Sequence, residues 1–419
     1  MRRALFVFVL AVVSFPRAAW PQGQPVGPEF LVNTYTTGDQ GQPVAAMDSS
    51  GDFVVVWTSL PDQDGSGYGI FGQRYDSSGA SAGPEFPVNS YTTSQQFNPS
   101  VSAAAAAGDF VAVWMSGGQD GSSYGVFGQR YAGSGTPLGP EFRVNSYTTT
   151  GQSYPAVGAD SAGNFVVVWQ SSGQDGSSYG VFGQRYASSG APLGPEFRVN
   201  SYTTGSQVYP AVGADSAGNF VVTWAGDLQD GSGYGVFGQR YASSGTPLGP
   251  EFRVNSYTTD FQGIPAVAAD SSGFVVAWTS YAQDGSTRGV FGQRYAASGA
   301  ALGTEFRINT FTTGLQEIPV VAVDASGNFV VVWDSSGQDG SSVGVFGQRF
   351  DSSGSPLGLE FRANTATVNE QSASSVAANA AGNFVIVWNA DIQDGSSFGV
   401  LGQRYAPMLP VELTRFTID

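Results

Sequence analysis

One stretch of sequence recurs seven times along the chain, and this repetition limits the possible folds more than any other feature. The stretch is represented by residues 164–186, NFVVVWQSSGQDGSSYGVFGQRY. Its tryptophan returns about every 55 residues, which predicts that one supersecondary unit is repeated in tandem. The seven tryptophans are Trp57, Trp114, Trp169, Trp224, Trp278, Trp333 and Trp388.

Each repeat contains four strand-like runs separated by turn residues. In residues 156–202 these runs are AVGAD, FVVVWQ, GVFGQRY and PEFRVNS. The second run is apolar on both faces, so we expect it to be covered on both sides. Four short antiparallel strands in each of seven units predict an all-β fold, a seven-bladed β-propeller. Immunoglobulin-type sandwiches need longer units, and helical repeats need a 3.6-residue apolar pattern that is absent here.

The two ends of the repeat region predict closure into a ring. Residues 27–33, GPEFLVN, match a fourth strand that has no first three strands before it. Residues 402–405, GQRY, end a third strand that has no fourth strand after it. We therefore expect the N-terminal strand to complete the last blade of a propeller that spans residues 27–405. Such closure leaves no free sheet edge.

The segments outside the repeats have other predicted roles. Residues 1–19 read as a secretory signal peptide, because Arg2 and Arg3 precede an apolar run too short to span a bilayer. Residues 406–419 do not follow the repeat, and we expect them to begin a further C-terminal β or sorting segment that is truncated. No other stretch is apolar enough for a membrane span, so no membrane insertion is expected.

The charge balance and the missing residue types exclude several functions. The chain has 17 basic residues against 33 acidic ones, and it contains no His and no Cys. An acidic protein disfavours nucleic acid, which requires a basic surface. Zinc sites built on Cys or His, Ser-His-Asp triads, cysteine nucleophiles and lysine Schiff bases are all excluded, since every basic residue is Arg.

Residue size assigns the strands to positions within a blade. The first run of each repeat has small side chains, as expected for strands that converge on the propeller axis. The tryptophan of the second run is expected to be core, because packing between blades buries its large apolar surface. Arg185 and Glu196 lie on adjacent strands, and the pattern predicts that they pair across the hairpin.

The loops between strands 2 and 3 and between strands 4 and 1 share one face, here called the upper face. Each 2→3 loop carries Gln-Asp-Gly-Ser, represented by Gln174 and Asp175. The Asp either forms a turn or ligates a cation or a sugar. If calcium binds, the strongest candidates are the loops that hold a second carboxylate. These candidate metal ligands are Asp62 with Asp64, and Asp391 with Asp394.

Aromatic residues gather in the same loops. A Tyr beside Asp and Gln offers an apolar face and polar groups, which suits a sugar, while packing at the rim between blades is the alternative. The candidate ligand-binding tyrosines are Tyr68, Tyr124, Tyr179 and Tyr234 in 2→3 loops, and Tyr147 and Tyr202 in 4→1 loops.

Eight acidic residues depart from the repeat, and all fall in upper-face loops. Such a field would attract cations and repel acidic ligands, although loops also tolerate acids without function. These residues are Asp39, Asp62, Asp227, Asp260, Glu317, Asp334, Glu370 and Asp391.

The consensus QxxPAVxADxxGNFVVVWxSxxQDGSxYGVFGQRY is similar to repeats in large secreted and surface proteins of bacteria, many of them adhesin-like. The resemblance covers residues 27–405 and implies a β-propeller on the cell exterior. It implies no catalytic residues. The segment LPVELTRF likewise resembles the opening of C-terminal regions in secreted bacterial proteins.

Three functional classes stay open at this point. The sequence favours a secreted, monomeric module that is not an enzyme and that binds glycans or a surface protein through the upper face. The alternatives are a structural or protein-interaction scaffold and a glycosidase-type propeller. A glycosidase needs two carboxylates at a defined separation near a pocket, whereas strict repetition disfavours a single asymmetric site.

Overall fold

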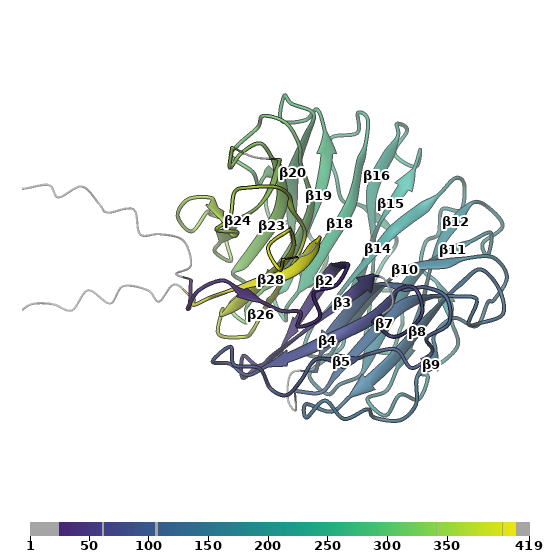
Figure 1. Ribbon diagram of the computed structural model, residues 1–419. Helices are drawn as coiled ribbons and strands as arrows, with labels where there is room; N and C mark the ends of the chain where they lie inside the picture. Colours follow the sequence, from purple (N-terminus) through teal and green to yellow (C-terminus); the bar gives the residue numbers. More distant parts are fainter. Residues whose placement is uncertain (1–24, 61–62, 105–107, 341, 396, 408–419) are drawn as a thin grey trace, which may run out of the picture.

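The computed structural model describes residues 25–407, apart from 61–62, 105–107, 341 and 396. The predicted signal peptide, Asp62 and most of the predicted C-terminal segment lie outside the described residues. The described chain forms seven four-stranded antiparallel sheets arranged as the blades of a β-propeller (Figure 1). No helix among these residues is long and apolar enough to cross a membrane. The predicted fold class is confirmed.

Each blade is an up-and-down meander in which strands pair in sequence order, as in β10-β11-β12-β13 of blade 3. The innermost strands of blades 1 to 7 are β2 (Asp39–Met47), β6 (Gln96–Ala103), β10 (Gln152–Ala159), β14 (Gln207–Ala214), β18 (Gln262–Ala269), β22 (Gln316–Val323) and β26 (Gln371–Ala378). The second strands are β3 (Phe53–Leu60), β7 (Phe110–Gly117), β11 (Phe165–Ser172), β15 (Phe220–Asp227), β19 (Gly273–Tyr281), β23 (Phe329–Ser336) and β27 (Phe384–Asp391).

The outer half of each blade consists of a long third strand and a fourth strand of two residues. The third strands are β4 (Gly69–Tyr75), β8 (Tyr124–Tyr131), β12 (Tyr179–Tyr186), β16 (Tyr234–Tyr241), β20 (Arg288–Ala296), β24 (Val343–Phe350) and β28 (Phe398–Tyr405). The fourth strands of blades 1 to 6 are β5 (Phe86–Pro87), β9 (Phe142–Arg143), β13 (Phe197–Arg198), β17 (Phe252–Arg253), β21 (Phe306–Arg307) and β25 (Phe361–Arg362).

The fourth strand of blade 7 comes from the opposite end of the chain. Strand β1 (Phe30–Leu31) pairs with β28, with Phe30 opposite Gly402. Beyond the strand, the side-chain oxygen of Asn33 accepts the backbone N–H of Val400 at 2.7 Å. The innermost strands of neighbouring blades contact one another around the whole ring, β26 with β2 included. Closure of the last blade by the N-terminal strand is therefore confirmed.

The hydrophobic core lies between the blades rather than at the axis. Each of its seven clusters combines residues of two neighbouring blades, as where Val111 and Val113 of blade 2 meet Trp169 of blade 3. All seven repeated tryptophans have 0% of their surface exposed. Within this cluster Phe165 and Tyr186 stack with ring centroids 4.8 Å apart. The prediction that the tryptophans are core residues is confirmed.

Arg185 and Glu196, predicted to pair within one hairpin, each form a hydrogen bond to a neighbouring blade instead. Arg185 does not contact Glu196 but donates to the backbone carbonyl of Ser244 in blade 4. Glu196 accepts from the side-chain amide of Gln174 in its own blade 3. It also accepts the backbone N–H of Ser146 in blade 2 at 2.6 Å. The predicted Arg185–Glu196 pair is wrong, because both long side chains reach the adjacent blade. These bonds fix each blade against the next.

Candidate functional site

The repeated Asp of the Gln-Asp-Gly-Ser loop is held in a buried polar network. In blade 3, Asp175 accepts the backbone N–H of Ser177 at 3.1 Å and the side-chain amide of Asn200 at 3.2 Å. The amide of Asn200 also donates to Gln207 at 3.1 Å, and its oxygen accepts the N–H of Val181 at 2.7 Å. Asn200 and Gln207 are almost fully buried. The network joins the 2→3 loop to the 4→1 loop, which accounts for a structural role of Asp175.

Two of the predicted calcium ligands, Asp64 and Asp394, occupy the same kind of network. Asp64 accepts from the N–H of Ser66 at 3.1 Å, and the amide of Asn89 lies 3.4 Å from its other oxygen. Asp394 accepts from the amide of Asn33 at 3.1 Å. Asp391 ends strand β27. Across the described part of the chain, no group of three or more acidic side chains is placed to hold a metal ion. Calcium binding stays a prediction.

The six predicted tyrosines are all half-buried at the upper rim. Tyr68 of blade 1 and Tyr124 of blade 2 flank Phe97, with T-shaped ring pairs at 6.4 and 5.4 Å. Tyr234 of blade 4 meets Phe261 of blade 5 at 5.8 Å. Tyr68 and Tyr234 therefore pack between blades, as the alternative interpretation predicts, whereas Tyr124 meets Phe97 within blade 2. The backbone carbonyls of Tyr147 and Tyr202 accept hydrogen bonds from the side-chain amides of Asn145 and Asn200. Tyr179 begins strand β12.

A ring of β-bulges lies just inside this rim, at the upper end of the innermost strands. Each of these strands has a register shift against its second strand, at a residue in the left-handed region with φ between 50° and 55°. A non-glycine residue seldom adopts this conformation, and such residues and bulges cluster at functional sites. The seven bulge residues are Gln42, Asn98, Tyr154, Tyr209, Ile264, Ile318 and Ala373.

The bulges present two exposed aromatic side chains next to each other. Tyr154 of blade 3 and Tyr209 of blade 4 are 43% and 37% exposed, in contrast to the half-buried tyrosines of the rim. Their ring centroids lie 5.2 Å apart in a T-shaped arrangement. Burial, followed by the neighbouring Tyr209 and Tyr179, raises the pKa of Tyr154 above its ordinary value. The hydroxyl of Tyr154 therefore stays protonated at neutral pH and can donate a hydrogen bond.

Sequence reasoning missed Tyr154 and Tyr209 because the position varies from repeat to repeat. A signal was present, since proline follows the position in six repeats and proline inside a paired strand marks a bulge. The bulge turns the preceding side chain away from the alternation of the strand. Only the structure shows that two of these side chains touch.

Side chains of the preceding blade hold the bulges in place. In several repeats the residue after the tryptophan accepts the backbone N–H of the bulge residue in the next blade. Gln170 accepts from Tyr209 at 3.0 Å, and Asp334 accepts from Ala373 at 2.9 Å. In the same way Thr279 accepts from Ile318 at 3.1 Å. The bulge ring is thus fixed before any ligand arrives.

The ring is chemically uneven around the axis. Between blades 1 and 2 the amide of Gln42 donates to the oxygen of Asn98 at 2.7 Å. Blades 3 and 4 supply the two tyrosines, and blades 5 and 6 supply Ile264 and Ile318, the latter 38% exposed. An aromatic surface beside amide groups suits a ligand with both apolar and hydrogen-bonding faces.

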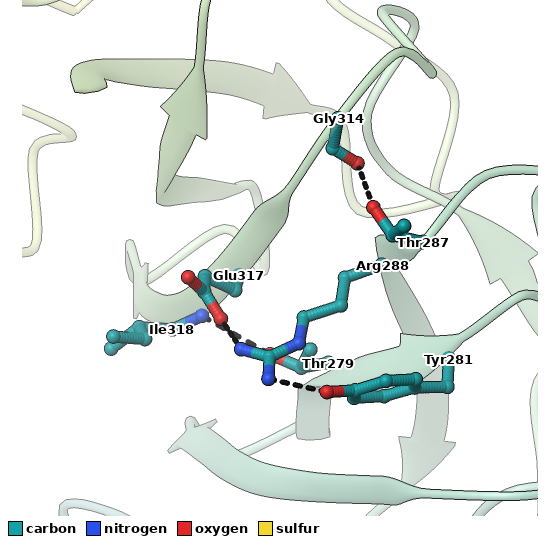
Figure 2. Close-up of polar contacts among 7 residues, drawn as sticks. All are labelled: Thr279, Tyr281, Thr287, Arg288, Gly314, Glu317 and Ile318. Carbon is teal, nitrogen blue, oxygen red and sulfur yellow. Dashed lines mark hydrogen bonds and ion pairs between the residues drawn. The ribbon is translucent and has the colours of Figure 1, made fainter. Parts of the chain in front are cut away.

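Two of the off-repeat acids are not free to attract cations. Asp334 is 4% exposed, and burial raises the pKa of its carboxyl to about 7, with the nearby Glu370 adding to the rise. Glu317 forms an ion pair with Arg288 (Figure 2). The guanidinium of Arg288 also lies over the ring of Tyr281 at 4.7 Å and donates to its hydroxyl. The negative field of the upper face is therefore weaker than the count of acids predicts.

No family model matches the chain, and no curated protein matches its sequence. Solved structures do match its shape. A protein of unknown function from Dyadobacter fermentans aligns at a TM-score of 0.54 with 9% identity, covering 91% of this chain and 98% of that one. The β-propeller domain of the Trilobed protease from Pyrococcus furiosus aligns at 0.51 with 7% identity, covering 92% and 100%. The endosialidase of phage phi92 aligns at 0.50 with 9% identity, covering 93% and 71%.

These likenesses define the chain as a β-propeller. They also overturn the prediction that the chain is not an enzyme, because the same fold is found in the phi92 endosialidase. Glycoside hydrolases with lower TM-scores are also among the matches. One is the α-L-arabinofuranosidase Arb93a of Fusarium graminearum, at a TM-score of 0.48 and 10% identity, covering 73% of this chain and 93% of that one. Another is an α-L-arabinanase of Penicillium chrysogenum, at 0.46 and 12%, covering 90% and 98%. At such identities the likeness shows the fold and assigns no residue.

Proposed function

We propose that this protein is a carbohydrate-binding β-propeller that acts outside the cell as a monomer. The observation that carries the proposal is the exposed pair of Tyr154 and Tyr209 at the upper end of the axis. A rigid, exposed aromatic pair on a structured ring is the kind of surface that holds a sugar. The proposal refines the upper-face site expected from the sequence and moves its centre from the rim loops to the bulge ring.

The chemistry of the pair fits the mixed character of a sugar ring. A tyrosine face packs against the C–H groups of a pyranose, and its hydroxyl bonds to a sugar hydroxyl. Because the two rings are T-shaped rather than parallel, they present a face and an edge at one corner. The backbone of Tyr209 is held by Gln170, so little conformational entropy is lost on binding. Preorganisation of this kind supports useful affinity from a small contact area.

The charge of the chain narrows the ligand class. The formal net charge is −16, so long-range electrostatics oppose strongly acidic glycans. Neutral glycans are the better match. The resemblance to adhesin-like repeats and the expected signal peptide support a role at the cell exterior, where glycans on a host or a neighbouring cell are available.

Binding of the purified propeller to an array of neutral and acidic glycans tests the proposal. The wild type should bind a subset of neutral glycans. The double variant Tyr154→Ala/Tyr209→Ala should lose at least about tenfold in affinity, which corresponds to roughly 1.4 kcal/mol of binding free energy. Tyr154→Phe/Tyr209→Phe should keep part of the affinity, because it retains the stacking surface. Tyr257→Ala, a half-buried loop tyrosine of blade 5, is the matched control.

Two outcomes would redirect the proposal. Equal binding by wild type and the Tyr154/Tyr209 double variant would exclude the bulge ring as the site. Binding to a surface protein but to no glycan would favour the protein-interaction scaffold. Because related folds include glycoside hydrolases, any bound oligosaccharide should also be incubated with the protein and analysed for shorter products by chromatography.

A further inference from the structure

The lower face carries a second repeated feature, a set of hollows between neighbouring blades. They lie where the 1→2 turn of one blade faces the 3→4 turn of the next, from the boundary of blades 1 and 2 to that of blades 5 and 6. Their volumes in that order are about 230, 100, 260, 110 and 40 Å³. None of the residues proposed for the upper site lines them.

Equivalent residues line each hollow. The third strand contributes the Arg of Gly-Gln-Arg, and the second strands of both blades contribute a Phe. The 3→4 turn of the following blade contributes one small residue at the mouth. From the first boundary to the fifth, these small residues are Gly133, Ser188, Ser243, Ala297 and Ser352.

The largest hollow, between blades 3 and 4, presents donors and acceptors together. Asp160 is buried at its wall and accepts both the backbone N–H and the side-chain amide of Asn164 at 2.8 Å. It also accepts the backbone N–H of Ala162 at 2.9 Å, so three of the roughly four lone-pair sites of its two oxygens are used and one is open to a ligand. Arg185 donates one N–H to Ser244, and a guanidinium carries five. Burial lowers the pKa of Arg185, which stays charged at neutral pH.

The walls below these groups are apolar. Phe165, Phe220 and Leu193 border the same hollow. One cation and one anion at the wall offset each other, so the hollow favours neither an acidic nor a basic ligand. Hydroxyl groups satisfy both, because a hydroxyl donates to the carboxylate and accepts from the guanidinium. The two larger hollows, of about 230 and 260 Å³, are below the roughly 300–1,000 Å³ of pockets for drug-sized ligands, so a single small ring is the appropriate size for them. The other three, of about 100, 110 and 40 Å³, are too small for such a ring.

We propose that the two larger hollows, between blades 1 and 2 and between blades 3 and 4, are subsites that each take one neutral monosaccharide unit, so that the lower face binds a repetitive glycan at two points. The inference shares a ligand class with the proposed function but uses a different face and different residues. Two weak subsites on one rigid ring act at high effective concentration, so a polymer can bind far more tightly than a single sugar.

The test counts sugars bound per chain. Methyl glycosides of glucose, galactose, mannose, xylose and arabinose are screened by ligand-observed NMR, and each binder is titrated by calorimetry. The wild type should bind more than one equivalent. Gly133→Trp/Ser243→Trp, which places a large side chain at each of the two larger hollows, should lower the number of equivalents. Ser244→Trp is the matched control, because this neighbouring turn residue does not line the hollow. Tyr154→Ala/Tyr209→Ala should leave the hollow sites unchanged.

Other results would overturn the inference. A single equivalent that only the tyrosine variant abolishes would place all binding at the upper site and leave the proposed function intact. An unchanged count in Gly133→Trp/Ser243→Trp, or no binding of any of the five sugars, would reject the hollows as subsites. If the tryptophan variants do not fold, Ala217→Leu fills the hollow between blades 3 and 4 with a smaller side chain. An unchanged number of sugars bound per chain in Ala217→Leu would likewise reject this hollow as a subsite.

Discussion

Arg288 of blade 5 and Glu317 of blade 6 form an ion pair across the blade boundary, the one ion pair among the residues that the structure describes (Figure 2). Every other described repeat has Tyr, Val or Phe at the position of Arg288. The pair is partly exposed, with 29% and 20% of the side-chain surfaces accessible. A substitution in one repeat has thus replaced an aromatic rim contact with an electrostatic one.

Removal of this ion pair should destabilise the propeller only modestly. We expect Arg288→Ala to lower the free energy of unfolding by about 1 kcal/mol, because solvent screens a partly exposed pair. Urea unfolding at low and high salt measures the effect. The difference between wild type and Arg288→Ala should shrink at high salt, and Glu317→Gln should behave like Arg288→Ala. A salt-independent loss would mean that the aliphatic stem of Arg288 and its contact with Tyr281 dominate.

Asp334 should make stability depend on pH. Burial raises its folded pKa from 3.8 to about 7, so the folded protein holds this proton more tightly than the unfolded chain does. The stability linked to the group is fully present below pH 3.8 and is lost as pH rises through 7. Complete ionisation costs on the order of 4 kcal/mol, at about 1.4 kcal/mol per pKa unit.

Asp334→Asn isolates this contribution, because an amide oxygen still accepts the N–H of Ala373 and carries no charge. We expect the variant to melt at a higher temperature than wild type at pH 8 and at a similar temperature near pH 4. The two proteins are melted at each pH across this range, and the difference between their melting temperatures is taken. Other carboxylates titrate alike in both proteins, so their effect cancels in this difference. A constant difference at all pH values would show that Asp334 does not titrate there.

Trp169→Ala should be strongly destabilising. The side chain is fully buried between blades 2 and 3, so its removal leaves a large cavity and should cost roughly 3–5 kcal/mol. Trp169→Phe should cost less, because the phenyl ring fills part of the space and the indole N–H of Trp169 has no hydrogen-bond partner to lose. Denaturant unfolding measures both. Equal losses for the two variants would contradict this account of the core.

Removal of residues 27–33 should open the last blade. Val32 is 1% exposed, and Asn33 caps the N–H of Val400, so the deletion exposes both apolar surface and the edge of β28. We expect a large fall in melting temperature and a tendency to aggregate. Pro28→Ala, at an exposed position of the same segment, is the control and should melt like wild type. An unchanged melting temperature after the deletion would argue against ring closure.

The sequence by itself determined the architecture. Trp169 and its six counterparts set the period, and FVVVWQ, apolar on both faces, required a strand covered on both sides. Residues 27–33 matched a missing fourth strand, which established the closure of blade 7. These features are local or strictly repeated, so the hydrophobic pattern of one repeat is enough to specify the whole ring.

Only the tertiary structure decided which side chains meet between blades. Arg185 and Glu196 are neighbours in the hairpin, yet each bonds to another blade, because long side chains reach across a boundary that the sequence does not describe. Tyr154 and Tyr209 lie on separate repeats at a variable position. They meet because a bulge in each innermost strand turns them toward the next blade. Periodicity specifies what repeats, whereas the contacts that differ between repeats depend on how the blades pack around the axis.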